Sequence, residues 1–438
     1  METSSLIYAS NLMHRFGLGC VEVIMMDNKT VLISLIGKGR MGKEEKGYEK
    51  TEYYFEEVDE VIDTSFFGTA LHKILLNHSH VDKWLIFGTN RSCWSELFYA
   101  VDERYRDEIE ELHNKVYHEE NKGISEELLQ NWQDTLEKYI PGIRLIMVDP
   151  RNYKIYIDHM IKEIPDDKRN LVVDITHAFR HMPVIIAFSI MMLKHIKNIS
   201  DIMVYYGAYE LKGDDEYTPV LKIDFINTLV SYAESLATYN YSGYFPPLLE
   251  LLGIHNTDKT YFKLEMNRQP RSSLEEINKS LNEISLKDDY QSVVADYIKK
   301  DFSPLVGATL DRRMVERGKF FFDKKQYLKA LILLYEGIII AIGRKYKSVT
   351  AINRDMREDV RSFIKRSQHI IFSSDFERDT YFKLEYTRNA AAHGSEAEGK
   401  GKGIKECVQE EEHFKELFKR GIELYESIVK ESEFALNI

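Results

Sequence analysis

Five short runs of β-branched and apolar residues, each followed by glycine or polar residues, constrain the fold of this chain most. The first, residues 30–36 (TVLISLI), stops at the segment GKGR, as a buried strand that enters a glycine-rich loop does. The other runs are residues 84–87, 145–148, 171–175 and 202–206. Helical stretches such as residues 69–76 and 183–195 lie between them. This order predicts a parallel sheet with helices on both faces.

The loops at the ends of these strands hold the candidate ligand-binding residues, because ligands on such sheets bind beyond the carboxyl ends of the strands. Thr176 and His177 can hydrogen-bond a phosphate, a ribose or a base edge, and the alternative is a loop whose side chains only cap the following helix. Asp174 is expected to organise this loop rather than to touch an anion. The candidates are Gly37, Lys38, Gly39, Asn90, Arg91, Ser92, Thr176, His177 and Arg180.

The length of 438 residues indicates about two or three domains. We expect an N-terminal extension at residues 1–28 and a sensor domain at 29–225 that carries a helical insertion at about 102–138. A helical connector at 226–300 and a helical domain at 301–438 follow. Residues before Met26 are interpreted as a start-site extension.

The net charge of −12, from 71 acidic and 59 basic residues, gives no global positive field to collect nucleic acid, so we expect no DNA partner and only local RNA contacts. The three cysteines show no CxxC spacing, which fits a reducing cytoplasm and argues against structural zinc or another metal site. The apolar run near residues 182–193 is too short to cross a bilayer. We therefore predict a cytoplasmic protein that binds no membrane and no metal.

A second motif, RNAAAHG, begins at Arg388 and places His393 five residues further on. Three alanines let another backbone approach closely, and Gly394 is placed to end the helix. Spacing alone is a weak signal, because Arg106 and His113 also satisfy it within a charged helix where we expect no chemistry. Five helical positions correspond to about 500°, so Arg388 and His393 project about 140° apart and need a second copy of the helix to share one cleft.

The segment DITHAFRHMP, with GTNRSCW before it and YYGAYE after it, resembles the DxTHG family of CRISPR-associated proteins, which carry the Rossmann-like sensor domain known as CARF. The resemblance covers residues 29–224, and Ala178 replaces the final glycine of the family pattern. Its most specific residues are Asp174, Thr176, His177, Arg180 and Pro183.

The segments RNAAAH and KKQYLKALILLYEG resemble the HEPN ribonuclease domain. Together the two resemblances imply an α/β plus all-α chain, in which a CARF domain precedes a helical connector and a HEPN domain. They imply an endoribonuclease of type III CRISPR defence that cyclic oligoadenylate activates and that cuts single-stranded RNA as a homodimer without a metal. In that chemistry a ribose 2′-OH attacks the adjacent phosphorus. His393 exchanges protons, Arg388 stabilises charge, and Asn389 orients the substrate or His393.

We expect no cofactor, and cyclic tetra-adenylate is favoured over the hexa-adenylate as activator. A lesser hypothesis is slow degradation of the ring by the sensor. The alternative function is a nucleotide-sensing regulatory protein without nuclease activity, in which the C-terminal helices only dimerise. A nicotinamide oxidoreductase is disfavoured, because GKGRMG at residues 37–42 lacks the GxGxxG spacing of a dinucleotide site.

Overall fold

The computed structural model describes residues 29–39, 47–177, 179–213, 216–266, 268, 270–349, 353–394 and 403–434, with side chains as far as residue 430. The expected N-terminal extension, Ala178 and part of the GKGRMG segment lie outside the described residues. The chain divides into two compact units, Met1–Val230 and Ser231–Ile438.

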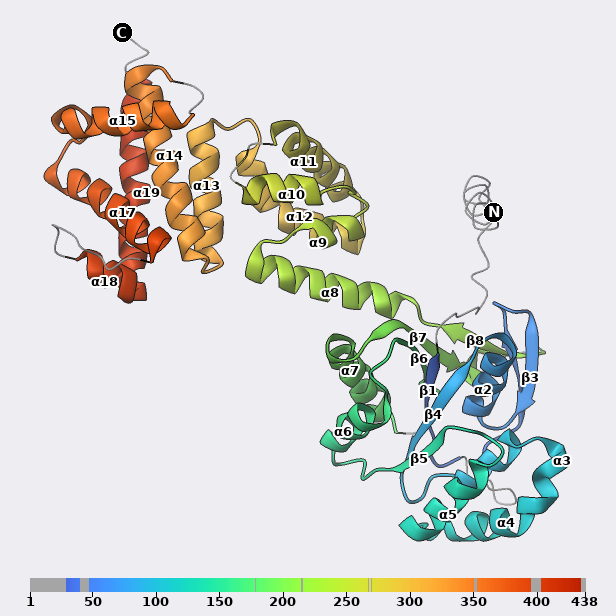
Figure 1. Cartoon of the computed structure of the whole chain (residues 1–438). Coiled ribbons are helices and arrows are strands. Elements are labelled where there is room, and N and C mark those ends of the chain that lie inside the picture. The colour runs from blue at the N-terminus through green and yellow to red at the C-terminus, as the bar shows by residue number, and fades with distance from the viewer. Residues whose placement is uncertain are drawn as a thin grey trace, which may run out of the picture. The chain divides into compact units, whose positions relative to one another are not determined.

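An eight-stranded sheet forms the centre of the N-terminal unit (Figure 1). Its strand order is β3-β2-β8-β7-β6-β1-β4-β5, and the five strands from β7 to β5 all run parallel. These five strands contain the runs expected from the sequence, so the prediction of a Rossmann-like parallel sheet is confirmed. Their bounds are β1 Thr30–Leu35, β4 Val81–Gly88, β5 Ile143–Met147, β6 Arg169–Asp174 and β7 Ile199–Gly207.

Three further strands, which the sequence did not lead us to expect, extend one side of the sheet. β8 (Thr218–Lys222) runs antiparallel to β7, β2 (Thr51–Phe55) runs parallel to β8, and β3 (Glu60–Thr64) runs antiparallel to β2. The buried hydroxyls of Thr51 and Thr218 lie 2.8 Å apart and join β2 to β8. The extension brings the chain around β2 close to the carboxyl end of β7.

Alternate residues of the central strands face two different helical layers, because successive side chains of a strand point to opposite faces. On β1, Leu32 packs into the core that includes α2 (Phe67–His78), whereas Val31 packs with α6 (Lys154–Glu163) and α7 (His181–Ile196).

The segment expected as a helical insertion belongs to the same layer as α2. Its Trp132 indole N–H donates to the Trp94 carbonyl at 3.0 Å, and both tryptophans are buried in one core. The elements here are η1 Trp94–Ala100, α3 Glu103–Arg106, η2 Asp107–Ile109, α4 Glu110–Glu119 and α5 Glu126–Leu136.

The described part of the C-terminal unit is helical, as expected. One apolar core belongs to the helices before residue 306, and a second is built around α14, whose residues from Ala330 to Gly343 are almost all buried. The helix expected at 354–371 is divided in two, because Ser367 ends its first part. The bounds are α8 Phe225–Ser242, α9 Pro246–Leu251, α10 Asp258–Glu265, α11 Arg271–Ser285, α12 Tyr290–Phe302, η4 Ser303–Leu305, α13 Leu310–Asp323, α14 Tyr327–Lys347, α15 Arg354–Arg366, α16 Gln368–Ile371, α17 Asp375–His393, α18 Ile404–Gln409 and α19 Glu411–Phe434.

Candidate functional site

A hollow of about 410 Å³ lies at the carboxyl ends of β1, β6 and β7, where ligands bind on sheets of this kind. Four of the expected binding residues line it, namely Lys38, Gly39, Thr176 and His177. The other residues of its lining are Tyr48, Glu49, Tyr53, Ser65, Tyr206, Gly207, Tyr209 and Glu210.

The floor of this hollow is organised by Asp174 at the end of β6. The carboxylate is fully buried, and its Oδ1 accepts the backbone N–H of Thr176 at 2.8 Å. The Thr176 hydroxyl in turn accepts the backbone N–H of Gly207 at 2.9 Å, which ties the end of β6 to the end of β7. Burial raises the pKa of Asp174 to about 7. This geometry fits the expectation that Asp174 organises the loop.

His177 is held in place by the protein around it. Its Nε2 lies 3.3 Å from the backbone N–H of Phe67, and its ring stacks on Tyr48 with a centroid distance of 4.2 Å. Desolvation lowers the pKa of His177 to about 3, so the ring is neutral at pH 7. Because Nε2 accepts the hydrogen bond, the proton of the neutral ring belongs on Nδ1.

The glycine-rich loop after β1 uses its backbone donors within the protein. The N–H of Gly37 donates to the Tyr48 hydroxyl at 2.7 Å, and the N–H of Gly39 points at the Cys93 sulfur at 3.2 Å. A Cβ atom at Gly39 would lie 2.1 Å from the carbonyl oxygen of Gly47, so glycine is required there for close packing of two backbones. Lys38 remains the exposed cation of this loop at the hollow.

The expected residues after β4 lie outside the lining of the hollow. Ser92 is fully buried, donates to the Ile36 carbonyl at 2.8 Å and accepts the Thr89 N–H at 2.8 Å, so it joins the ends of β1 and β4. Asn90 and Arg91 are exposed, and so is Arg180 in front of α7. Ligand binding by Asn90, Arg91, Ser92 and Arg180 stays a prediction.

Several residues of the lining were not among the candidates, although a signal existed for some of them. Tyr206, Tyr209 and Glu210 belong to the YYGAYE segment, which carries part of the family resemblance. Tyr48 and Tyr53 gave no such signal, because only the pairing of β2 with β8 brings this segment to the hollow.

The second candidate site lies on α17, where Arg388 faces α14. The Cζ atom of Arg388 lies 4.6 Å from the centre of the Tyr335 ring, and Nη2 lies 3.7 Å from Oε1 of the buried Glu336. The Nη1 group donates to Oδ1 of Asn389 at 2.7 Å. The structure thus brings Arg388 and Asn389 together and fixes the guanidinium against α14.

His393 is the last residue of α17 and is exposed. Gly394 follows in the left-handed conformation, with a φ of +59°, and ends the helix where the sequence places its end. Among the described residues no hydrogen-bond partner of the His393 ring is found. Helical geometry keeps Arg388 and His393 on different faces, so one α17 helix does not bring both side chains to one phosphate.

A second hollow, of about 430 Å³, runs along α17 on the side of its small residues. Thr387, Ala390, Ala391 and Gly394 line it together with residues of α14, α18 and α19. These small side chains leave room for another chain segment beside the last turn of α17.

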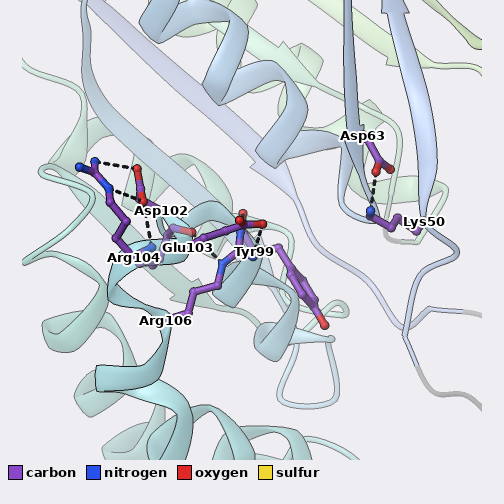
Figure 2. Close-up of polar contacts among 8 residues, drawn as sticks. Lys50, Asp63, Tyr99, Asp102, Glu103, Arg104 and Arg106 are labelled. Atoms are coloured by element: carbon purple, nitrogen blue, oxygen red, sulfur yellow. Dashed lines mark hydrogen bonds and ion pairs between the residues drawn. The ribbon is translucent and has the colours of Figure 1, made fainter.

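The other Arg/His pair, Arg106 and His113, has a structural role (Figure 2). Arg106 donates to the carbonyl oxygens of Val101 at 3.0 Å and Tyr99 at 3.2 Å, so its guanidinium holds the chain at the start of α3. The His113 ring stacks on Phe98 at 4.1 Å, and burial lowers the pKa of this histidine. The expectation that no chemistry takes place here fits these contacts.

Within the described part of the chain, no helix is both long and apolar enough for a membrane span. In the same residues, no three His, Cys, Asp or Glu side chains gather in a way that would hold a metal ion.

Comparison with known proteins places the N-terminal unit in a family. Residues 31–211 match the CARF domain of the CRISPR system endoribonuclease Csx1. The CRISPR-associated protein MJ1674 of Methanocaldococcus jannaschii is 23% identical over 407 residues, which is 83% of this chain and 62% of that relative. The chain thus spans less than two thirds of this relative.

The parallel sheet, the hollow at its strand ends and the family match define the N-terminal unit as a CARF domain. The chain is a CARF-containing CRISPR-associated protein of the type III ancillary group.

Proposed function

We propose that this chain is an endoribonuclease that cuts single-stranded RNA and that cyclic oligoadenylate activates. The observation that carries the proposal is the end of α17, where Arg388 is fixed on Glu336 and bonded to Asn389 while His393 stays exposed. A guanidinium held by a carboxylate keeps further N–H donors for a phosphate, and an exposed imidazole can exchange protons with a substrate.

The proposed reaction is a transfer within the RNA. The ribose 2′-oxygen forms a bond to the adjacent phosphorus while the bond from phosphorus to the 5′-oxygen breaks, which leaves a 2′,3′-cyclic phosphate. The proton leaves the 2′-OH and another proton reaches the departing 5′-oxygen, and His393 side chains serve these transfers. Arg388 stabilises the negative charge on the phosphoryl oxygens, and Asn389 orients it. Metal independence is part of the proposal.

The proposed active enzyme is a homodimer, because a two-fold pairing of α17 supplies Arg388 of one protomer and His393 of its partner. The N-terminal unit offers support for pairing. Val184, Phe188 and Met192, spaced four apart on α7, are 54%, 67% and 49% exposed and form an apolar stripe on one helical face. A second copy that covers this stripe would place two CARF hollows in one dimer.

Activation is proposed to be a population shift, in which the ring binds the cutting-competent dimer more tightly than the resting one. The CARF hollow suits an oligonucleotide without free ends, since aromatic rings such as Tyr48 and Tyr209 offer stacking surfaces and Lys38 offers positive charge. Cyclic tetra-adenylate is proposed as the activator in preference to the hexa-adenylate.

Cleavage of a fluorescent single-stranded RNA in EDTA, with and without each ring, tests this function. The expected result is cutting that depends on the ring, proceeds in chelator and leaves cyclic phosphate ends. A protein that binds a ring yet cuts no RNA with either one, with or without added Mg²⁺, would instead be a sensor whose C-terminal helices only dimerise.

A further inference from the structure

Three arginines converge on one buried carboxylate beside the proposed catalytic Arg388. Glu336 on α14 has a side chain that is only 9% exposed. Arg357 Nη1 lies 3.0 Å from its Oε2, Arg361 Nη2 lies 3.3 Å from its Oε1, and Arg388 Nη2 approaches Oε1 at 3.7 Å. Arg357 and Arg361 are four residues apart on α15, so both reach Glu336 from one helical face.

The positive charge of this cluster exceeds what Glu336 neutralises. One carboxylate faces three guanidinium groups, and Glu385, which accepts the Tyr335 hydroxyl at 3.1 Å, still leaves the cations in excess. The Nε atoms of all three arginines are buried without a hydrogen-bond partner among the residues that the structure describes. Guanidinium forks with free N–H groups are the preferred protein partners of phosphate.

We infer that Arg357 and Arg361 bind a backbone phosphate of the RNA substrate next to the scissile one. The inference rests on the proposed ribonuclease function and extends the substrate path from α17 to α15. The side chains of Arg357 and Arg361 are 30% and 29% exposed, so both reach solvent while Glu336 fixes their positions. The site therefore reads a phosphodiester backbone and no base, and it adds affinity for RNA without sequence preference.

A binding measurement on the full chain tests this subsite. The dissociation constant of a fluorescent single-stranded RNA is measured at several salt concentrations, with cyclic tetra-adenylate present and with His393→Ala in every protein to prevent cutting. Arg357→Gln and Arg361→Gln should each weaken binding roughly tenfold. Each should also reduce the slope of log K against log salt by about 0.7, the value for one lost phosphate contact on a single strand.

Arg354→Gln is the matched control, because Arg354 lies on the same helix, is 89% exposed and pairs with Glu358 instead of Glu336. Its salt slope should equal that of the parent. Each test variant leaves Glu336 two arginine partners, and circular dichroism checks that α15 stays helical.

An unchanged salt slope in both Arg357→Gln and Arg361→Gln would overturn the inference, since arginines that only neutralise Glu336 contribute no phosphate contact. A neutral methylphosphonate at the position flanking the cut gives a second readout in proteins that retain His393. It should lower kcat/KM of the parent but not lower that of Arg361→Gln further. If the parent neither binds nor cuts RNA, the proposed function fails, which is distinct from failure of the subsite alone.

Discussion

The CARF hollow and the end of α17 differ in how much of each site one chain supplies. At the hollow, Asp174, Thr176 and Gly207 form a continuous hydrogen-bonded network, and His177 is locked by Phe67. On α17, Arg388 is anchored, whereas His393 is exposed on another face. The difference teaches that an intact pocket can be found within one protomer, while the proposed cutting site requires a second copy to be assembled.

The largest effect is expected at α17. His393→Ala should lower ring-activated RNA cleavage by about 10²- to 10⁴-fold, the usual contribution of a general acid or base, and should leave ring binding unchanged. The measurement is initial cleavage rate alongside calorimetric titration with cyclic tetra-adenylate. His369→Ala, at an exposed histidine of α16, is the control and should cut like the parent. Full activity in His393→Ala would remove the assigned site.

A pH effect is expected only in the N-terminal unit. The folded-state pKa of Asp174, raised by burial to about 7, lies above its unfolded value of about 3.9, so its contribution to stability is complete below pH ~4 and declines as pH rises toward 7. Asp174→Asn removes this term, and its stability relative to the parent should improve by about 2 kcal/mol between pH 5 and pH 7.

Urea unfolding followed by tryptophan fluorescence measures this difference, because all three tryptophans, Trp84, Trp94 and Trp132, lie in the N-terminal unit. A difference between the two proteins that does not change with pH would show that Asp174 has an ordinary pKa.

Thr176→Val should cost about 1.5 kcal/mol of stability in the same tryptophan signal. Valine keeps the shape of threonine but leaves the Gly207 N–H without its acceptor, and an unpaired buried donor is costly. Thr176→Ser keeps the hydroxyl and is the control. If the valine variant is as stable as the serine variant, the tie between β6 and β7 is unimportant, and the two sites differ less than their geometry indicates.

The smallest effect is expected for a charge at the rim of the hollow. Lys38→Gln should weaken binding of cyclic tetra-adenylate about two- to fivefold without a change in stability, because Lys38 is exposed. Arg180→Gln is the informative comparison, since Arg180 lies outside the lining. A larger loss for Arg180→Gln in calorimetric titration would mean that the bound ring extends beyond the described hollow.

The fold could be predicted from the sequence where a buried pattern was strong. The five parallel strands are nearly continuous apolar runs such as TVLISLI, because both faces of the sheet are covered. The edge strands β2 (TEYYF) and β3 (EVIDT) mix polar and apolar residues, and their pairing with β8 depends on contacts distant in sequence. Propensity alone therefore gave no reason to expect them.

The candidate sites show the same limit. Lys38, Thr176 and His177 lie directly after strands, so a rule about strand ends places them at the hollow. The role of Ser92 could not be predicted, since a serine after a strand looks the same whether it meets a ligand or the Ile36 carbonyl. Likewise, nothing in the RNAAAH motif reveals that Glu336, 52 positions before Arg388, anchors that arginine.

The composite site on two copies of α17 is tested most directly by mixing two inactive proteins. Arg388→Ala and His393→Ala proteins are combined, subunit exchange is verified by native mass spectrometry, and ring-activated RNA cleavage is measured in EDTA. A composite site predicts that the mixture cuts RNA far faster than either variant alone, because each mixed dimer retains one Arg388 and one His393 from opposite protomers. Mixed dimers that cut no faster than the separate variants would contradict it.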